Sequence, residues 1–472
     1  MGQEIQDTRF SREAFETFNR RLARETELLA QWERDGVLAG AGYRLGFELE
    51  GWLVDAQGEP APRNQAFLQK LDDPQVVPEL ARFNFEVNDD PVDFGPGMFD
   101  RMHQSLLGRW RRCEQAAREL EMQALSIGIL PTLRLDQLNL DNISGLSRYQ
   151  ALNEQVFRLR NGQPIQIDIE GVQHLQHEHH DVMLEAATTS LQIHLQVGSE
   201  HAVRAFNAAK MISAASVAVG ANSPFFLGRE LWAETRIPLF EQAIAVGGSE
   251  YSRRVTFGVR YAQDSLLECF EANRDFYPVL LPDLYDEPAE QLAHLRLHNG
   301  TVWRWNRPLV GFDAQGKPHY RIEHRVIGAG NSALDVVADT ALFVGLMVAL
   351  IERTEPAGEL LDFAVARENF YHAAQLGLSA EVKWLQGRHG TLSELLPASI
   401  LPLAHSGLRA IGLSAEESER WLGVIEARAR TGRTGAAWQV EWVRKHGEDW
   451  QGLVQAYAAQ QDTGAPVHEW PL

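Results

Sequence analysis

Four short stretches of the chain alternate apolar and polar residues, at positions 46–50, 84–88, 190–196 and 321–325. A period of two is typical of a β-strand with one packed face, because successive side chains of a strand point to opposite faces. The polar face of these strands carries Glu, Gln, His, Asn and Arg side chains. We therefore predict that the four strands line a wet concavity that can bind metal ions.

The acidic side chains on this face would repel one another if the strands were neighbours, because like charges within ~4–6 Å raise each other's pKa. Mg²⁺ or Mn²⁺, which accept hard carboxylate and imidazole ligands, would relieve that repulsion. Arg325 beside Glu323 adds a fixed positive charge suited to a phosphate. A solvated amphipathic sheet explains any single strand better, so the prediction depends on all four together. The shared polar faces hold Glu48 and Glu50, then Glu86 and Asn88, then Gln192 and His194, and finally Arg321, Glu323 and Arg325.

The rest of the pattern predicts an α+β body with several helices. Apolar residues at helical spacing predict amphipathic helices at 12–33 and 97–122, and a helix rich in small residues at 202–220. A buried helix is predicted at 336–351, where the apolar run is shorter than the roughly 20 residues that span a bilayer. A short strand is predicted at 124–130.

Two turns of the same kind, Asp55–Gly58 and Asp313–Gly316, predict hairpins, because Asp starts a turn and Gly adopts positive φ. After Asp335 the pattern is almost wholly helical to about residue 460. The chain contains neither repeats nor a low-complexity linker. We predict an α+β body at residues 1–354 and a helical C-terminal section at residues 355–472 that packs on it.

Residues 162–185 are predicted to form a strand followed by a loop that contains the run His177–Asp181. Such a run suggests a metal site, but contiguous residues in a loop lack the strand or helix geometry that holds a tetrahedral ion. We predict a solvated or partner-facing loop. The sequence leaves open whether the stretch His177–His180 has a role.

Composition and charge limit the classes of function. The chain has 472 residues, of which 44% are hydrophobic and 23% charged, as in globular proteins. Its formal net charge of −20 argues against a nucleic-acid surface, which requires clustered Lys and Arg. The two cysteines, Cys113 and Cys269, make no disulfide framework or CxxC motif, which fits a reducing cytoplasm. Residues 1–7 have no basic region that leads into an apolar run, so neither a secretory signal nor membrane association is expected.

Two glycine motifs resemble nucleotide-binding loops, and we reject both. Gly311–Pro318 nearly matches the P-loop pattern, but Pro318 lacks the hydroxyl that would bind Mg²⁺, and a hairpin turn explains the motif better. Gly328–Ala333 matches the relaxed dinucleotide fingerprint, but the strand before it is charged, whereas that fold needs a buried apolar strand. The helix N-terminus after it could still help to bind an anion.

Together with further blocks, the four strands form an ordered set over about residues 40–440. In this set the chain resembles the carboxylate-amine ligases related to glutamate-cysteine ligase, of the family-2 type, whose fold is like that of glutamine synthetase. The chain departs from the family at Gly128–Pro131, where Gly-Thr-His-Pro is familiar, and at Ile193, where Val is more usual. The first departure leaves the amino-acid substrate open. The matching blocks are Gly46–Glu50, Asn84–Asp90, Arg148 with Tyr149, Gln192–His194, Ala221–Pro224 with Arg229 and Arg236, His298–Trp303, Arg321–Arg325 and Thr431–Gln439.

The resemblance implies a curved, largely antiparallel sheet with helices packed on its convex side, and a concave face that binds ATP and Mg²⁺, with Mn²⁺ as an alternative. By this similarity the candidate metal ligands are Glu48, Glu50, Glu86, His194 and Glu323. Arg325, which would contact the transferred phosphate, and Glu323 are the candidate catalytic residues. The candidate substrate-binding and ATP-binding residues are Arg148, Tyr149, Arg229, Arg236, Thr301 and Trp303. For the three arginines among these, a structural or surface ion pair is the alternative, and for Trp303 it is a place in the core.

The reaction that the resemblance implies is an ATP-dependent joining of a carboxylate to an amine through an acyl phosphate. Glutamate and cysteine are the first substrates to consider, with glutathione biosynthesis as the context. Two alternatives remain: a phosphotransferase or phosphohydrolase that uses the same metal cup, and a nucleotide-binding protein without catalysis. We expect small-molecule partners and a cytoplasmic location. The sequence leaves open the acceptor amine, the number of metal ions and the oligomeric state, and a homo-oligomer is compatible with it.

Overall fold

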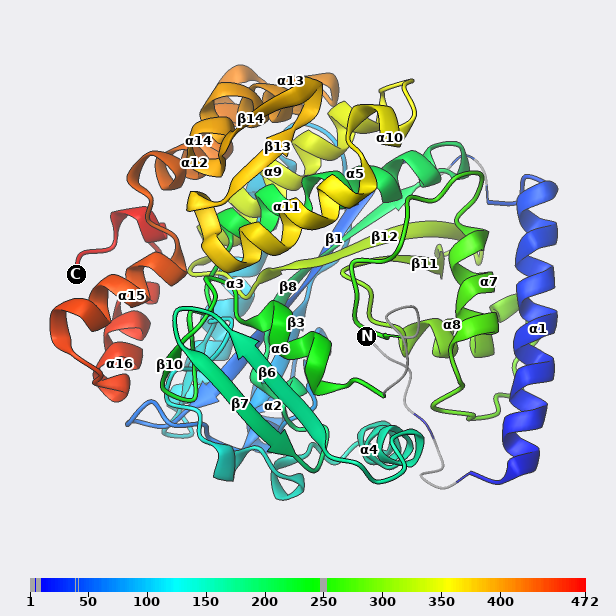
Figure 1. Cartoon of the computed structure of the whole chain (residues 1–472), viewed down its shortest axis with the longest axis horizontal. Coiled ribbons are helices and arrows are strands. Elements are labelled where there is room, and N and C mark those ends of the chain that lie inside the picture. Colours follow the sequence, from blue (N-terminus) through cyan, green and yellow to red (C-terminus); the bar gives the residue numbers. More distant parts are fainter. Residues whose placement is uncertain (1–4, 6–9, 39, 41, 247–252) are drawn as a thin grey trace.

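A curved antiparallel sheet forms the centre of the computed structural model (Figure 1). The structure describes residue 5 and residues 10–38, 40, 42–246 and 253–472. The stretch 1–7, from which we expect no secretory signal, lies outside the described residues except for residue 5.

The main sheet has eight strands, and its neighbouring strands pair antiparallel. In spatial order they are β11 (Asn306–Phe312), β12 (Pro318–Gly328), β8 (Ser190–Val197), β1 (Arg44–Val54), β3 (Asn84–Asn88) and β2 (Val76–Pro78), while β4 (Val92–Asp93) and β5 (Gln123–Leu125) also pair with β1. The four strands predicted from alternation are β1, β3, β8 and β12, and they lie side by side. The curved, largely antiparallel sheet is thus confirmed, although β5 is shorter than the strand predicted at 124–130.

Alternation along the strands gives the sheet two different faces. In β1 the side chains of Leu45, Phe47 and Leu49 are buried in the core, whereas Glu48 and Glu50 point to the opposite face and line a cavity. Register is set partly by the predicted hairpin turns. Each turn closes with a glycine at a φ of 77° whose N–H donates to the carbonyl of the turn's first Asp. Only glycine adopts this conformation without strain.

Three helices cover the apolar face of the sheet: α3 (Met98–Arg118), α5 (Ser199–Val219) and α9 (Ala333–Ile351). The His324 ring on β12 lies 4.8 Å from the Phe343 ring on α9, between ring centroids. Helix α9 is apolar and long enough to cross a membrane, but 89% of its most apolar stretch is buried inside the protein. It is therefore the core helix that the sequence predicts.

Shorter helices frame the polar face, namely α4 (Ser147–Leu159), α6 (Arg236–Ala243), α7 (Leu267–Phe276) and α8 (Ala293–Gly300), whereas α2 (Asn64–Leu71) packs on α3. The predicted amphipathic helix at 12–33 is α1 (Arg12–Arg34), which stands at one side of the molecule and packs on α7 and α8 (Figure 1). A buried contact of 2.6 Å between Glu25 Oε1 and His294 Nδ1 joins α1 to α8. Helix α1 therefore supports one wall of the polar face from behind.

The loop predicted for the histidine run is wrong. Residues Ile165–Glu170 (β6) and His174–His179 (β7) form an antiparallel hairpin, so His177 and His179 lie on a strand. The hairpin forms because Ile165, Ile167 and Ile169 alternate with exposed polar residues and become buried. His179 Nε2 lies 2.7 Å from Asp181 Oδ1, a pairing that explains part of the run without a metal ion.

The C-terminal section is mostly helical, as predicted, but contains a second small hairpin that the pattern does not show. Its strands, β13 (Glu381–Trp384) and β14 (Arg388–Thr391), have four residues each, too few for periodicity to reveal. Outside this section, in the body, another two-stranded sheet joins β9 (Phe225–Phe226) to β10 (Arg229–Glu230). The helices of the section are α10 (Ala357–Leu360), α11 (Phe363–Leu376), α12 (Leu392–Leu395), α13 (Leu401–Ala410), α14 (Ala415–Thr431), α15 (Gly435–His446) and α16 (Trp450–Gln461).

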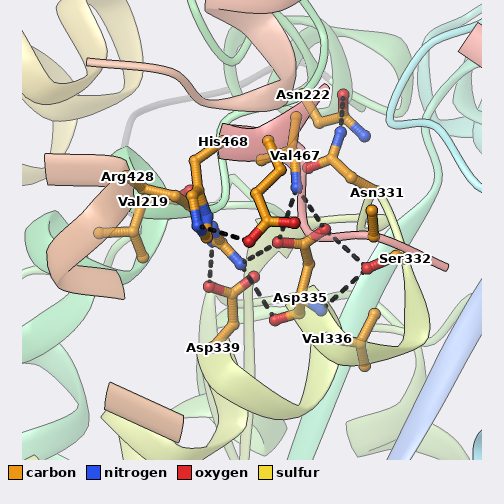
Figure 2. A network of polar contacts seen from close by, with 12 residues as sticks. Val219, Asn222, Asn331, Ser332, Asp335, Val336, Asp339, Arg428, Val467 and His468 are labelled. Carbon is orange, nitrogen blue, oxygen red and sulfur yellow. Dashed lines mark hydrogen bonds and ion pairs between the residues drawn. The ribbon is translucent and has the colours of Figure 1, made fainter. Parts of the chain in front are cut away.

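Buried charges hold this section against the core helix (Figure 2). Arg428 of α14 donates to Asp335 Oδ1 at 2.8 Å and to Asp339 Oδ1 at 2.6 Å, both on α9. The N–H of Val467, close to the end of the chain, donates to Asp335 Oδ2 at 3.1 Å. Asp335 therefore binds both α14 and the terminal segment, whereas Asp339 binds α14 alone.

Candidate active site

A cavity of about 490 Å³ lies over the polar face of the sheet. Its floor comes from β1, β3, β8 and β12, and its walls come partly from α4 and α8. The parity of the four strands thus collects their polar side chains in one enclosed space. The cavity is lined by all the polar-face residues predicted from the sequence: Glu48, Glu50, Glu86, Asn88, Gln192, His194, Arg321, Glu323 and Arg325.

One group of possible metal ligands comes from three adjacent strands. His194 lies opposite Glu323 across the β8–β12 pair, and Glu48 comes from β1 on the other side. His194 Nε2 is 3.3 Å from Glu48 Oε1 and 3.9 Å from Glu323 Oε1. Both ring nitrogens of His194 are buried, and neither makes a hydrogen bond in the described part of the chain. An imidazole without hydrogen bonds between two carboxylates is a donor set that fits a divalent ion.

A second group consists of Glu50, Glu79 and Glu86, whose ligand oxygens lie within 4.8 Å of one another. Glu50 and Glu86 are directly opposite across the β1–β3 pair. Burial first, and the neighbouring Glu79 second, raise the pKa of Glu50 to about 7. Burial and the nearby Glu48 and other carboxylates raise the pKa of Glu86 well above its ordinary value. A divalent cation would offset the carboxylate repulsion that contributes to both shifts, so this group also fits a metal ion.

Glu79 is a member of this group that the sequence pattern does not identify. It follows β2 in an irregular segment, where alternation gives no information. Its Oε2 accepts from the N–H of Leu80 at 3.0 Å, and the hydroxyl of Tyr149 lies 3.5 Å from the same atom. These contacts direct its carboxylate toward Glu50 and Glu86.

Two arginines surround Glu323, and only one of them was predicted. Arg307 on β11 lies opposite Glu323 and donates to both of its carboxylate oxygens, at 2.7 and 2.8 Å. Arg325 Nη1 is 3.5 Å from Glu323 Oε2 and also donates to Gln192 Oε1. Burial disfavours the charge of Glu323, but the arginines outweigh it and lower its pKa to about 2. Glu323 is therefore a permanent anion, and its neighbours fix its orientation.

Glu185 is another cavity residue that the sequence pattern does not reveal. It belongs to a short 3₁₀ helix, Glu185–Ala187, and lines the cavity near Glu79 and Glu50. Burial and these two carboxylates raise the pKa of Glu185 well above its ordinary value. Arginines balance this acidic part of the cavity, namely Arg148, Arg296, Arg307, Arg321 and Arg325. The cavity can therefore accommodate both cations and phosphate oxygens.

The structure divides the six predicted substrate-binding residues into two sets. Four of them line the cavity: Arg148 and Tyr149 from α4, and Thr301 and Trp303 from the segment after α8. Arg148 Nη2 donates to the Tyr149 hydroxyl at 2.7 Å. The other two, Arg229 and Arg236, are not among the lining residues.

Arg229 and Arg236 occupy quite different places. Arg229 is exposed on β10. Arg236 is 2% exposed and donates to Glu234 Oε1 at 2.9 Å, so the structure favours the structural ion pair over direct substrate binding for this residue. The sequence alone does not distinguish a structural ion pair from substrate binding, because an arginine in either role can have similar neighbours along the chain.

The chain resembles solved structures of known proteins at low sequence identity. No curated protein sequence matches the chain significantly. Among solved structures, the glutamate–cysteine ligase of Francisella tularensis in complex with AMP has a TM-score of 0.56 at 11% identity, with 90% of this chain and 89% of that chain covered. A bifunctional glutathione synthetase from Pasteurella multocida has a TM-score of 0.51 at 11% identity; the match covers 93% of this chain but only 55% of that one.

These structural matches establish the fold, which is that of a glutamate–cysteine ligase. The sequence itself matches the glutamate-cysteine ligase family 2 (GCS2) over residues 44–459, nearly the whole chain. That range includes all four strands of the cavity floor and both groups of possible metal ligands. The chain therefore belongs to the glutamate-cysteine ligase family 2.

Proposed function

We propose that this protein is an ATP-dependent carboxylate-amine ligase that forms an amide bond, of the γ-glutamyl type, through an acyl phosphate. The observation that carries the proposal is the joint presence, in one cavity, of two acidic ligand groups and an arginine, Arg325, that contacts Glu323 of the first group. Family membership supports the same reaction class. Glutamate and cysteine are the first substrate pair to test, because both structural relatives are named for glutathione-related ligases.

The chemistry explains why such a cavity is needed. A carboxylate does not react with an amine at neutral pH, because oxide is a very poor leaving group. Transfer of the γ-phosphoryl group of ATP to the carboxylate gives an acyl phosphate, and the amine then displaces phosphate. Phosphoryl transfer depends mainly on positioning and on stabilisation of charge on the phosphoryl oxygens. The cavity must also exclude water, which would hydrolyse the acyl phosphate.

Arg325 is our candidate for contact with the transferred phosphoryl group. Its guanidinium is held between Gln192 and Glu323 on the cavity floor, and a planar, fixed guanidinium suits phosphate oxygens. Arg307 keeps Glu323 charged and correctly oriented. Arg148 and Tyr149, which line the cavity from α4, are candidates to bind a substrate carboxylate, and Thr301 and Trp303, which line it after α8, are candidates to bind the nucleotide.

Mg²⁺, or Mn²⁺ in its place, would supply neutralisation of the phosphate charge when bound. Glu48, His194 and Glu323 would hold one ion, and Glu50, Glu79 and Glu86 a second. We further propose that the enzyme acts in the cytoplasm on small-molecule substrates. The two cysteines support this location, since neither forms a disulfide in the structure.

The decisive test is release of ADP by the purified protein with Mg²⁺ and pairs of carboxylates and amines, starting with glutamate and cysteine. A ligase releases ADP and phosphate only when both partners are present, and mass spectrometry detects the amide. A phosphorylated product without an amide would instead show a phosphotransferase, and phosphate release alone a phosphohydrolase. Binding of ATP without turnover on any pair would indicate a silent nucleotide-binding protein. Each of these three outcomes would refute the proposal.

A further inference from the structure

Strand β12 contains a bulge at the position of the candidate catalytic arginine. His324 pairs with Ile193 and Ile327 pairs with Leu191, so three steps along β12 match two steps along β8. The extra residue of a bulge leaves the regular ladder and changes the direction of nearby side chains. Arg325 lies inside this irregular step. Its direction into the cavity therefore depends on how the bulge is held.

The bulge is held by Arg236, which lies outside the cavity. One Nη2 atom of Arg236 donates to the carbonyl of Arg325 at 3.1 Å and to that of Val326 at 2.6 Å. These are the two backbone acceptors inside the irregular step. Buried carbonyls without donors are costly, so a guanidinium that serves both stabilises this one backbone conformation.

Arg236 is itself fixed on two sides. Its Nε donates to Glu234 Oε1 at 2.9 Å, and its guanidinium carbon lies 5.3 Å from the centre of the Trp305 ring. The carbonyl of Trp305 accepts from the N–H of Arg325 at 3.0 Å. Both the N–H and the C=O of Arg325 are thus bound by residues that contact one another. The guanidinium of Arg236 has little freedom to leave this position.

The support continues into the C-terminal section. Glu234 Oε2 accepts from the N–H of Asn222 at 2.7 Å. The side chain of Asn222 in turn accepts from Gln439 of α15 at 2.9 Å and donates to the hydroxyl of Tyr457 of α16 at 2.8 Å. Asn331, which precedes α9, joins the same cluster (Figure 2). A continuous series of buried hydrogen bonds therefore runs from the terminal helices to the backbone of Arg325.

We propose that Arg236 is a positioning residue, which holds the β12 bulge so that Arg325 points at the transferred phosphate, and that Glu234 and Asn222 support it. The inference rests on the proposed function for the role of Arg325. This role takes the place of the direct substrate contact predicted for Arg236, because a side chain that is buried outside the cavity cannot reach the substrate. Through Gln439 and Tyr457, and not through Arg428, it also gives the C-terminal section an indirect part in holding Arg325, although that section contributes no residue to the cavity.

The test compares two buried arginines with similar surroundings. Arg236→Lys keeps the positive charge but cannot serve Glu234 and both carbonyls with the same geometry. Arg428→Lys is the matched control, because Arg428 is equally buried, binds carboxylates and also donates to two backbone carbonyls, at 2.9 and 3.2 Å. Both variants should lose thermal stability. Only Arg236→Lys should lower kcat, by about 100-fold for a misplacement near 1 Å, with the KM for ATP within about twofold of wild type.

Equal kcat values for wild type and Arg236→Lys, or equal losses in both lysine variants, would overturn the inference. If Arg236→Lys does not fold, Glu234→Gln tests the same support more gently and should lower kcat in the same direction. Crystal structures give a second measurement that needs no turnover. In Arg236→Lys the Arg325 guanidinium should leave its position 3.5 Å from Glu323, and in Arg428→Lys it should stay. Unmoved Arg325 in Arg236→Lys crystals would refute positioning even if wild type proves inactive as a ligase, which would refute only the proposed function.

Discussion

Replacing Glu86 by Gln should stabilise the metal-free protein and weaken its response to metal. Without metal, burial and neighbouring carboxylates raise the pKa of Glu86 well above its ordinary value of 4.5. The folded protein therefore keeps a proton that the unfolded chain releases. Stability falls as the pH rises from 4.5 to the folded pKa, by about 1.4 kcal/mol per pH unit. Each pH unit in this interval therefore adds to the penalty that Glu86→Gln removes.

Gln is an isostere of the protonated acid and carries no such penalty. Its carbonyl can still accept from Asn88 Nδ2, which lies 2.9 Å from Glu86 Oε1. A chain of 472 residues has an unfolding entropy of about 1 kcal/mol/K, so each pH unit of this penalty corresponds to a gain of about 1.4 °C in Tm. Saturating Mg²⁺ should reverse the order. At a concentration 100 times Kd it stabilises wild type by about 2.7 kcal/mol per site, whereas Gln offers a weaker ligand.

The assay is thermal unfolding of both proteins between pH 5 and 8, with EDTA and then with Mg²⁺. Glu16→Gln, on the exposed surface of α1, is the control and should change stability by less than about 0.5 kcal/mol. A Glu86→Gln protein that is less stable than wild type in EDTA, with the same dependence on pH, would show that the carboxylates do not repel as argued. An unchanged response to Mg²⁺ would exclude Glu86 as a ligand.

Three further variants test other parts of the structure. Glu323→Gln should lower turnover by at least about 100-fold, and by leaving Arg307 buried without a counter-charge it should cost about 3–5 kcal/mol of stability; full activity would remove Glu323 from the site. Arg428→Met should cost a similar amount for the same reason, with calorimetry showing a single transition, whereas separate melting of the C-terminal section would indicate an independent domain. Lys210→Met tests a buried amine whose pKa burial lowers to about 7 from 10.5. Between these two pH values the amine is protonated in the unfolded chain but neutral in the folded protein, so the free energy of unfolding of wild type should rise relative to that of the variant as the pH increases from 7 to 10.5. Below pH 7 burial of the charged amine should cost wild type up to about 5 kcal/mol. Denaturant titrations at pH 6.5 and pH 10 measure the difference in stability between the two proteins, and the same difference at both pH values would refute this.

The residues of the cavity floor could be predicted because they lie on regular strands. Parity alone places Glu48 and Glu50 on one face, and antiparallel pairing then brings Glu86 and His194 next to them. What parity could not supply was adjacency of the four strands. The resemblance to a ligase family supplied it, and the sheet order confirms it.

The site residues that the sequence pattern does not identify share a physical reason. Glu79 and Glu185 lie in an irregular segment and in a three-residue helix, where no period constrains the direction of a side chain. Arg307 is on a strand, but the following Pro308 interrupts the alternation that would have marked it. Of the histidine hairpin only the second strand, β7, was missed, because its residues are almost all polar and only Leu175 and His179 are buried. Periodicity therefore finds side chains on long regular elements and fails where tertiary contacts alone decide direction.

The balance of charge between the two acidic groups decides where a cation is needed most. Arg307 and Arg325 already neutralise Glu323 in the first group, and its low pKa follows from them. In the described part of the chain no salt bridge reaches the second group, and Glu50 and Glu86 keep raised pKa values instead. A divalent ion therefore relieves more repulsion at the second group than at the first. This difference is the reason that Glu86, rather than Glu323, is the residue at which removal of a charge should reveal the metal.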